Sequence, residues 1–586
     1  MGSDSSQWVF KAALLVLALV SIVTSIILYE VPESGYYYNL YLQLPRYFWA
    51  LAILGLATSA VLAALLRGKG HLAKLAGLLV LVFFLQILLT PYFLGYLTDD
   101  RADAMYIPGE VHAIYSSGHF YQAYDKYPLV SILYSEIFMV VNVPYIRYLT
   151  LVPALFSVMF VFALYKILGE VGPEGRFITC LVLLMSVVYY GSYYQLILHP
   201  SWYAFTLSVL LIYLLISRRF MDTLSGELLI GIFVVTLPFA HPYYITDSIM
   251  FLAAMVVYSR IRERPYAKIY GTYLFVSTVI FLTWIIHNQA AYSSLQSILN
   301  ALQHTYVAPA GVKGTEKASV LTRHDILAYA FGHVGRFSLI LVLLPILFLF
   351  SRNKKRMFLS HGRLWYIINV LVAIQVSMLV LPIFAHNPDR YINVSYLSVA
   401  LPMEVVIISK YVRWNRVLKG IALGFVVMAL VTSVFALYYY PPISLRPNIG
   451  ITSNEIVSTS FIFSHREHDV FVFSPHDEIN VRYCEFRDLA TWKACTYSNI
   501  RYTYWEVFPP RHFGYATHHR FTLLIPVDRA YIELTDYALQ AYLYVPTFRR
   551  THRITRADYR HMNADSHLDR VYTGLNVRVY LWSKSG

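Results

Sequence analysis

Long apolar runs separated by short polar segments occupy the first three quarters of the chain, up to about residue 440. A helix needs about 20 apolar residues to cross a bilayer. The pattern therefore predicts thirteen membrane-spanning helices, and an alternative for the short seventh and eighth is a re-entrant hairpin. The expected ranges are 8–29, 46–66, 75–97, 146–168, 177–197, 201–217, 228–240, 242–258, 269–287, 335–350, 364–384, 391–409 and 420–440.

The pattern changes at Pro441-Pro442, which we take as a domain boundary. Short alternating segments at 470–473, 521–525 and 577–581 predict strands, and 454–463 predicts a short helix. We therefore expect a polytopic α-helical membrane protein in which residues 441–586 form a small α/β domain.

Composition agrees with a membrane protein. The chain is 58% hydrophobic and 14% charged, whereas soluble proteins carry roughly 25% charged residues. Its net charge is +14, but the basic residues lie in short clusters between apolar runs, so the charge does not indicate nucleic-acid binding. The first apolar run is long enough to span and has no small-residue cleavage site, so no cleavable signal peptide is expected.

The basic residues also predict orientation. One set of loops between the expected spans holds twenty Lys and Arg, and the opposite set holds six, or nine with Arg46, Arg147 and Arg336 at the boundaries. Because cytoplasmic loops are rich in Lys and Arg, we expect a multi-pass protein of the cell membrane. Its N-terminus would be cytoplasmic and everything after Tyr440 extracytoplasmic.

Unusual polar residues gather at the outer ends of the predicted spans, where ionisable groups near hydrocarbon cost free energy and are often functional. The alternative is that a His-Pro pair at a helix end is merely a turn and that Asp99 and Asp100 lie on a solvated helix end. The residues concerned are Asp99, Asp100, Asp103, His199, His241, His287, His386, Asp389 and Arg390.

Three outer segments are long: 98–145, 288–334 and the C-terminal domain. Within the first, the apolar run 129–143 is too short to span comfortably, and a span there would invert every later loop. We expect this run to form a helix lying on the outer membrane surface.

Several short motifs in these segments resemble the GT-C superfamily of integral-membrane glycosyltransferases, especially its archaeal members. That fold has a first catalytic span followed by a large outer loop. The loop opens with an acidic residue, passes through a short helix that ends near a Gly, and reaches an aromatic-Pro-Leu segment. The corresponding residues are Asp103, Gly118 and Tyr127-Pro128-Leu129, with further likeness at Phe239-Ala-His-Pro242, Asp389-Arg390-Tyr391, Pro402, Asp569-Arg-Val-Tyr572 and Val577-Arg-Val-Tyr580. The C-terminal domain has no WWD-type motif, which argues against transfer of a whole oligosaccharide to asparagine.

The resemblance implies a domain order and an activity. Residues 1–74 would be additional transmembrane helices, and 75–440 the catalytic module. The enzyme would move a sugar from a polyprenyl-phosphate donor to a glycan, lipid or protein acceptor on the extracytoplasmic face, with membrane lipids as its other partners.

Roles follow from that chemistry. A carboxylate must accept the acceptor's proton, and Asp103 is the expected base, with Asp100 in reserve. Arg390 suits the leaving lipid phosphate, because its guanidinium is permanently charged and fork-shaped. His386, His199 and His241 would donate to phosphate or sugar hydroxyls.

No cofactor or metal is expected; if a divalent metal does bind, Asp99, Asp100 and Asp103 are the candidate ligands. Cys484 and Cys495 are expected to pair if the C-terminal domain lies in an oxidising compartment, whereas Cys180 lies in an apolar run. Two alternatives stay open: a lipid or solute transporter or flippase, whose polar residues should lie near the bilayer midplane, and a non-catalytic membrane scaffold for an envelope partner.

Overall fold

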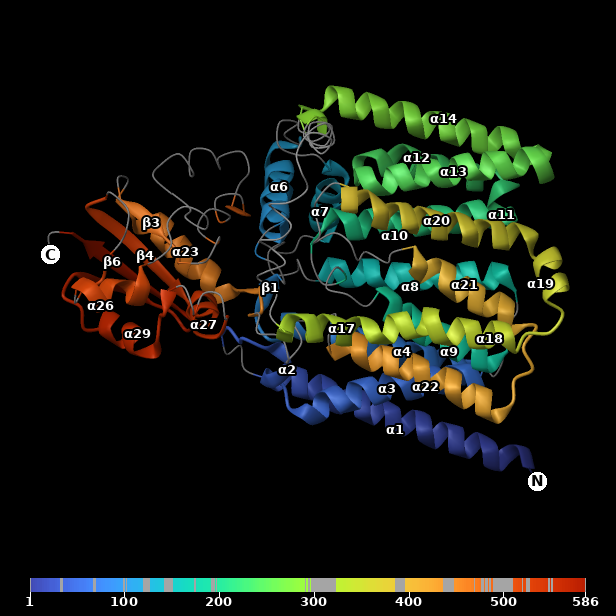
Figure 1. Cartoon of the computed structure of the whole chain (residues 1–586), viewed down its shortest axis with the longest axis horizontal. Coiled ribbons are helices and arrows are strands. Elements are labelled where there is room, and N and C mark those ends of the chain that lie inside the picture. The colour runs from blue at the N-terminus through green and yellow to red at the C-terminus, as the bar shows by residue number, and fades with distance from the viewer. Residues whose placement is uncertain are drawn as a thin grey trace.

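The computed structural model places an α-helical bundle beside a small sheet domain (Figure 1). For Asp103 and a few other helical residues, only the backbone is described. The described residues are 2–31, 35–66, 70–98, 101, 103–119, 127–141, 151–172, 175–190, 195, 198–289, 291–293, 296, 323–384, 396–435, 447–467, 470–475, 479, 483, 486–487, 510–518, 520–522, 527–545, 549 and 552–584.

Each of the thirteen predicted spans coincides with a helix. They are α1 (Gly2–Glu30), α3 (Arg46–Leu65), α4 (His71–Leu88), α8 (Leu151–Val171), α9 (Arg176–Tyr190), α10 (Pro200–Ile216), α12 (Leu224–Thr236), α13 (Pro242–Arg262), α14 (Arg264–His287), α17 (Arg323–Ser338) continuing into η4 (Leu339–Leu343) and α18 (Leu344–Leu349), α20 (Gly362–Phe384), α21 (Leu397–Ser409) and α22 (Arg416–Ser433).

Seven of these helices are long and apolar enough to cross a membrane, judged by length and composition over the described residues. An eighth is added if the bent pair α19 (Lys354–Ser360) and Gly362–Ser377 is one span. The remaining apolar helices have 10–17 residues. The chain is therefore a polytopic helical membrane protein, as predicted from its apolar runs.

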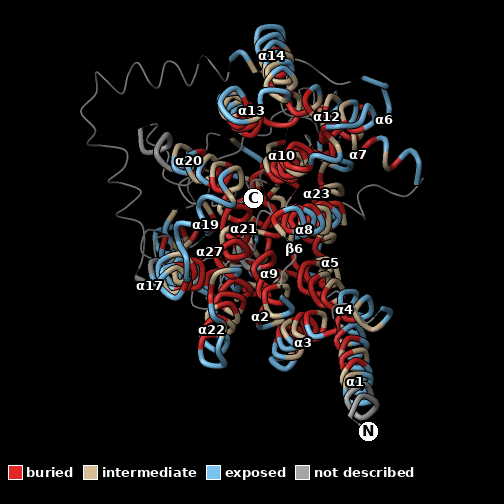
Figure 2. The backbone as a smooth tube through the Cα atoms, turned by 90° about the vertical axis from the view of Figure 1, so that its right-hand side faces the viewer, coloured by how far each residue is buried: buried red, intermediate tan, exposed pale blue. Residues whose placement is uncertain are grey.

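The bundle helices run side by side, and the segments that link them gather at two ends. α11 (Arg218–Met221) and α19 lie at the end where the chain begins, and the sheet domain lies beyond the other end (Figure 1). Seen end-on, buried segments fill the middle of the bundle and exposed ones face outward (Figure 2). The outward faces are apolar. In the apolar 18-residue stretch of α1 only 28% of the residues are buried, and in that of α14 only 17%. Such surfaces suit a lipid environment.

Two helices of the first outer segment do not follow the bundle direction. α6 (Asp103–Ser117) crosses the end of the bundle that faces the sheet domain, and α7 (Pro128–Val141) packs against it (Figure 1). α7 covers the predicted short apolar run. Its 14 residues are fewer than a span requires, which agrees with the expected juxtamembrane helix.

Polar side chains join the helices where they are buried. Gln86 on α4 donates from Nε2 to the Ser21 carbonyl of α1 at 2.8 Å and accepts from the Thr24 hydroxyl at 2.9 Å. Hydrogen bonds of this kind hold helices together in lipid, where burial of apolar surface alone cannot.

The sheet domain is built on four strands in the order β3-β4-β6-β5. β3 (Phe471–Phe473) pairs parallel with β4 (Arg529–Thr535), while β6 (Val577–Ser583) pairs antiparallel with both β4 and β5 (Leu568–Thr573). The other helical elements are α23 (Ser453–His465), η7 (Arg511–Gly514), α26 (Tyr515–His518), α27 (Asp536–Tyr544) and α29 (Arg556–Met562).

The predictions for this domain are partly confirmed. α23, β3 and β6 lie where the sequence predicts them, and β4 and β5 were not predicted. The segment 521–525 is wrong as a strand at Phe521 and Thr522, and its remaining residues lie outside the described ones.

Candidate active site

The first outer segment is attached to the bundle by a chain of hydrogen bonds. On α6, Glu110 is 4% exposed and accepts from the Ser131 hydroxyl of α7 at 2.5 Å. Ser135 donates to the Val111 carbonyl at 3.2 Å. The Tyr134 hydroxyl in turn bonds to that of Tyr203 on α10. The helix that Asp103 begins is therefore fixed to α7, and α7 to α10.

His199 and His241 occupy equivalent places at the ends of neighbouring helices. His199 is the N-cap of α10, accepting from Ser201 N at Nδ1 (3.1 Å), and His241 is the N-cap of α13, accepting from Tyr243 N (3.3 Å). Each precedes a proline, which is pre-organised for the first helical position. The two rings lie 6.4 Å apart between centroids.

The caps decide which ring nitrogen of each histidine carries the proton. Because Nδ1 accepts in both residues, a neutral ring carries its proton on Nε2. Nε2 of His241 lies 3.0 Å from the Ser201 hydroxyl and is thereby engaged. The ring of Tyr127, the residue directly before α7, lies 4.8 Å from the His241 ring between centroids, tilted by 31°. The two histidines and the outer segment therefore meet at one end of the bundle.

An acidic residue that the sequence analysis did not single out lies further along α13, beyond its His241 cap. Asp247 on α13 is 5% exposed, and Oδ2 has no hydrogen-bond partner among the described residues. It interacts with the Tyr396 hydroxyl directly before α21. Asp247 was missed because it stands alone in the run Tyr-Ile-Thr-Asp-Ser and carries no motif.

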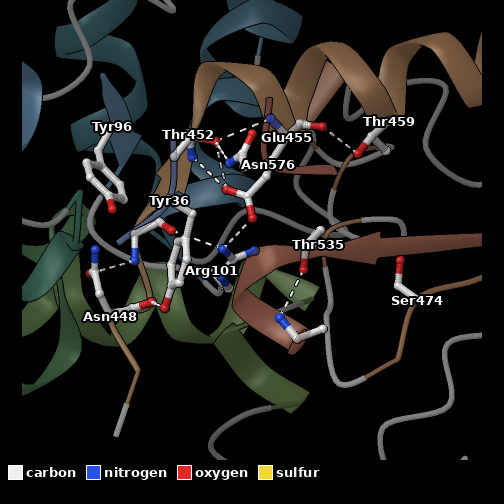
Figure 3. A network of polar contacts seen from close by, with 12 residues as sticks. Tyr36, Tyr96, Arg101, Asn448, Thr452, Glu455, Thr459, Ser474, Thr535 and Asn576 are labelled. Atoms are coloured by element: carbon white, nitrogen blue, oxygen red, sulfur yellow. Dashed lines mark hydrogen bonds and ion pairs between the residues drawn. The ribbon is translucent and has the colours of Figure 1, made fainter. Parts of the chain in front are cut away.

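A second polar network fastens the acidic loop to the sheet domain (Figure 3). Arg101 lies between Asp100 and Asp103 in sequence, and its Nη2 donates to Glu455 Oε1 at 2.7 Å and to the Gly450 carbonyl at 3.0 Å. Both side chains of the ion pair are buried, with 7% and 0% exposed. The guanidinium also lies 4.0 Å from the centre of the Tyr537 ring.

Backbone pairing surrounds this ion pair. β1 (Tyr96–Thr98), the strand just before the acidic loop, pairs antiparallel with β2 (Ile451–Thr452), just before α23. Thr452 and Glu455 form a capping box at the start of α23, and Asn576 Nδ2 donates to Thr452 Oγ1 at 2.7 Å. The cap uses one oxygen of Glu455 and the ion pair the other.

The network continues into the sheet domain. Glu533 on β4 is fully buried and accepts from Thr459 at 2.8 Å and from Ser474 at 3.2 Å. Burial also raises the pKa of Asp536 to about 6, against the opposing charge of Arg578. Thr459 also donates to the Glu455 carbonyl, so these contacts lead from Arg101 through α23 to Glu533 in the sheet.

The described residues include only part of the predicted site. Asp103 begins α6, but the position of its side chain lies outside what the structure describes. Asp99, Asp100, His386, Arg390, Cys484 and Cys495 also lie outside it, so their proposed roles and the disulfide stay predictions. Cys180 is buried in α9, as expected for a core residue. Among the described residues, no group of three His, Cys, Asp or Glu could hold a metal ion.

Comparison with protein-family models gives no match, and comparison with curated proteins gives none. Two solved structures are similar to this chain. The apo oligosaccharyltransferase of Archaeoglobus fulgidus has 11% identity and a TM-score of 0.47, with 86% of this chain and 74% of that chain covered. Apo ArnT from Cupriavidus metallidurans has 10% identity and a TM-score of 0.35, with coverage of 86% and 98%.

The likeness concerns the fold. With TM-scores below 0.5, these similarities say nothing of the substrate or the reaction of this chain.

Proposed function

We propose that this protein is a membrane glycosyltransferase that moves a sugar from a polyprenyl-phosphate donor to an acceptor on the extracytoplasmic face. The observation that carries the proposal is the gathering of α6, which Asp103 begins, with α7 and the His199 and His241 caps at one end of the bundle. The sheet domain lies beyond that same end (Figure 1).

The proposed reaction needs few groups. The acceptor oxygen attacks the anomeric carbon of the sugar, the bond from that carbon to the phosphate oxygen breaks, and the lipid phosphate leaves with the electron pair. Asp103 takes the acceptor's proton, with Asp100 in reserve, and Arg390 binds the leaving phosphate, with His386 beside it. His199 and His241 lie at the same end of the bundle, where they would donate to phosphate or sugar hydroxyls, although Nε2 of His241 is engaged with Ser201.

The test is transfer by the purified full-length chain from a polyprenyl-phosphate sugar to membrane acceptors. Asp103→Asn should lower the rate by at least about 100-fold, the usual size of a general-base contribution. The matched control is Asp528→Asn, which neutralises an exposed acid of the sheet domain and should keep the wild-type rate. Full transfer by Asp103→Asn, with an unchanged melting temperature, would remove Asp103 as the base.

Asp247 favours a second candidate, a lipid or solute transporter. A buried acid inside a membrane helix marks a substrate or ion pathway in many transporters, and Asp247 is such a residue. Transport by the wild type that Asp247→Asn abolishes and Asp103→Asn leaves intact, without sugar transfer, would support this candidate over the first.

A further inference from the structure

A cavity of about 710 Å³ lies between the bundle and the sheet domain. The elements that line it, α2 (Leu40–Gln43), α27 and α29, lie away from α6 and α7 (Figure 1). One wall is formed by the segment around α2, which leads into α3, and the other by α27 and α29. The lining residues are Tyr38, Asn39, Leu42, Leu539, Gln540, Leu543, Tyr544, Arg556, Tyr559 and Arg560.

The bundle wall lies at the level of the membrane surface. Leu42 is 71% exposed beside the start of α3, where Tyr47 is 58% exposed, and Tyr29 at the neighbouring end of α1 is 83% exposed. Exposed tyrosines at the ends of membrane helices mark the boundary between lipid and water. The cavity therefore opens where lipid headgroups would lie.

The domain wall carries two positive charges. Arg556 and Arg560 are one turn apart on α29 and both line the cavity. Arg556 donates to the Tyr544 hydroxyl at 3.0 Å, and neither guanidinium forms an ion pair with any acid in the described part of the chain. Asp558, between them, accepts from Thr555 N at 2.6 Å and lies 3.0 Å from His512, so its charge is already engaged.

A buried hydroxyl in the same wall lacks a partner. Tyr559 is 6% exposed and lines the cavity, and its hydroxyl has no hydrogen-bond partner among the described residues. Buried hydroxyls are seldom left without one, because the lost hydration is not recovered. Because the hydroxyl itself is closed off from solvent, Tyr559 lines the cavity with its ring.

We infer that this cavity binds the phosphate headgroup of an anionic membrane lipid. The two guanidinium groups pair with phosphate oxygens, to which their fork geometry is suited, and the Tyr559 ring forms part of the wall. The lipid chain lies along Leu42, Leu539 and Leu543. Free phosphate would leave this apolar lining unused, so the occupant is a lipid. The site is independent of the proposed sugar transfer.

Native mass spectrometry of the delipidated full-length protein tests the inference. Offered equal amounts of dioleoyl phosphatidylglycerol and dioleoyl phosphatidylcholine, the wild type should retain the anionic lipid. Arg556→Ala with Arg560→Ala should weaken phosphatidylglycerol binding by about tenfold or more, because two charge-assisted contacts are lost. Tyr559→Phe, which keeps the ring in place and removes a hydroxyl that does not face the cavity, should leave the binding unchanged.

Arg511→Ala is the matched control, since it removes an exposed arginine of the same domain that does not line the cavity. It should bind both lipids as the wild type does. Equal retention of the two lipids by the wild type would overturn the inference, as would a loss in Arg511→Ala as large as in the double variant. Displacement of the lipid by inorganic phosphate at equal concentration would show a simple anion site instead.

Discussion

At the scale of single residues, Arg101 has a larger structural role than its place in a short loop suggests. It lies two residues before Asp103, and its guanidinium is buried against Glu455 and Tyr537. Ionised groups are costly to bury, so such a pair depends on both partners being present. The backbone at the start of α6 is held through this contact.

Glu455→Gln should therefore destabilise the protein strongly. The amide keeps the shape of the cap at α23 but leaves the buried Arg101 charge without its counter-charge, which typically costs about 3–5 kcal/mol. Thermal unfolding in detergent measures the change. The matched control is Glu467→Gln, whose partner Arg529 forms an exposed pair with 44% and 58% of the side chains exposed. That change should cost less than about 1 kcal/mol. Equal effects of the two substitutions would contradict the role assigned to Arg101.

The residue scale is also where prediction from the sequence was weakest. The sidedness of the histidines was visible, and the structure brings His199 and His241 within 6.4 Å. Their Nδ1 atoms, however, serve as helix caps, a structural role that the sequence analysis did not predict. The partner of Arg101 lies 354 positions further along the chain, and no local pattern in the sequence indicates a contact over that distance.

At the scale of elements, the bundle helices were predictable because each is an apolar run. The strands of the sheet domain were less so. In β4 the apolar residues Ala530, Ile532 and Leu534 do alternate, but a polar position between them is the fully buried Glu533. β5 is an edge strand whose burial pattern is mostly exposed. A strand with little buried surface lacks the periodicity that prediction depends on, and the sequence of β4 does not indicate that a charged residue is buried within it.

Close helix packing gives a prediction at this scale. A Cβ added to Gly335 on α17 would lie 2.2 Å from Thr432 Oγ1 and 2.5 Å from Ala429 Cα, both on α22. Gly335→Ala should therefore force the two helices apart and lower stability by about 1–3 kcal/mol. Gly424→Ala on α22 is the control, since nothing lies within 4 Å of the added atom. It should be neutral or slightly stabilising, because alanine favours helices. Equal melting temperatures for the two variants would refute the packing argument.

At the scale of the whole molecule, the two ends of the helical bundle differ. The exposed basic residues of α19 lie at the end opposite the sheet domain (Figure 1). This agrees with the uneven distribution of Lys and Arg that predicts the orientation, although the orientation itself stays a prediction.

Labelling of single cysteines tests the orientation. In a chain whose Cys180, Cys484 and Cys495 are replaced by serine, Asp528→Cys should react with a membrane-impermeant maleimide in intact cells. Lys355→Cys on α19 should react only after the cells are permeabilised. Both positions are exposed, so accessibility within the folded protein does not differ between them. The reverse pattern would place the sheet domain in the cytoplasm.

The pairing of β1 with β2 has a consequence for the order of events during synthesis. Thr98 is made early and Ile451 late, with most of the bundle translated between them. Contacts between such distant segments form late in folding. The ribosome must therefore complete at least the start of α23 before β1 can pair with β2 and Arg101 with Glu455. A chain released before that point would keep most of its apolar helices but leave the loop holding Asp103 untethered. The pairing of β1 with β2 thus distinguishes a finished molecule from a nascent one.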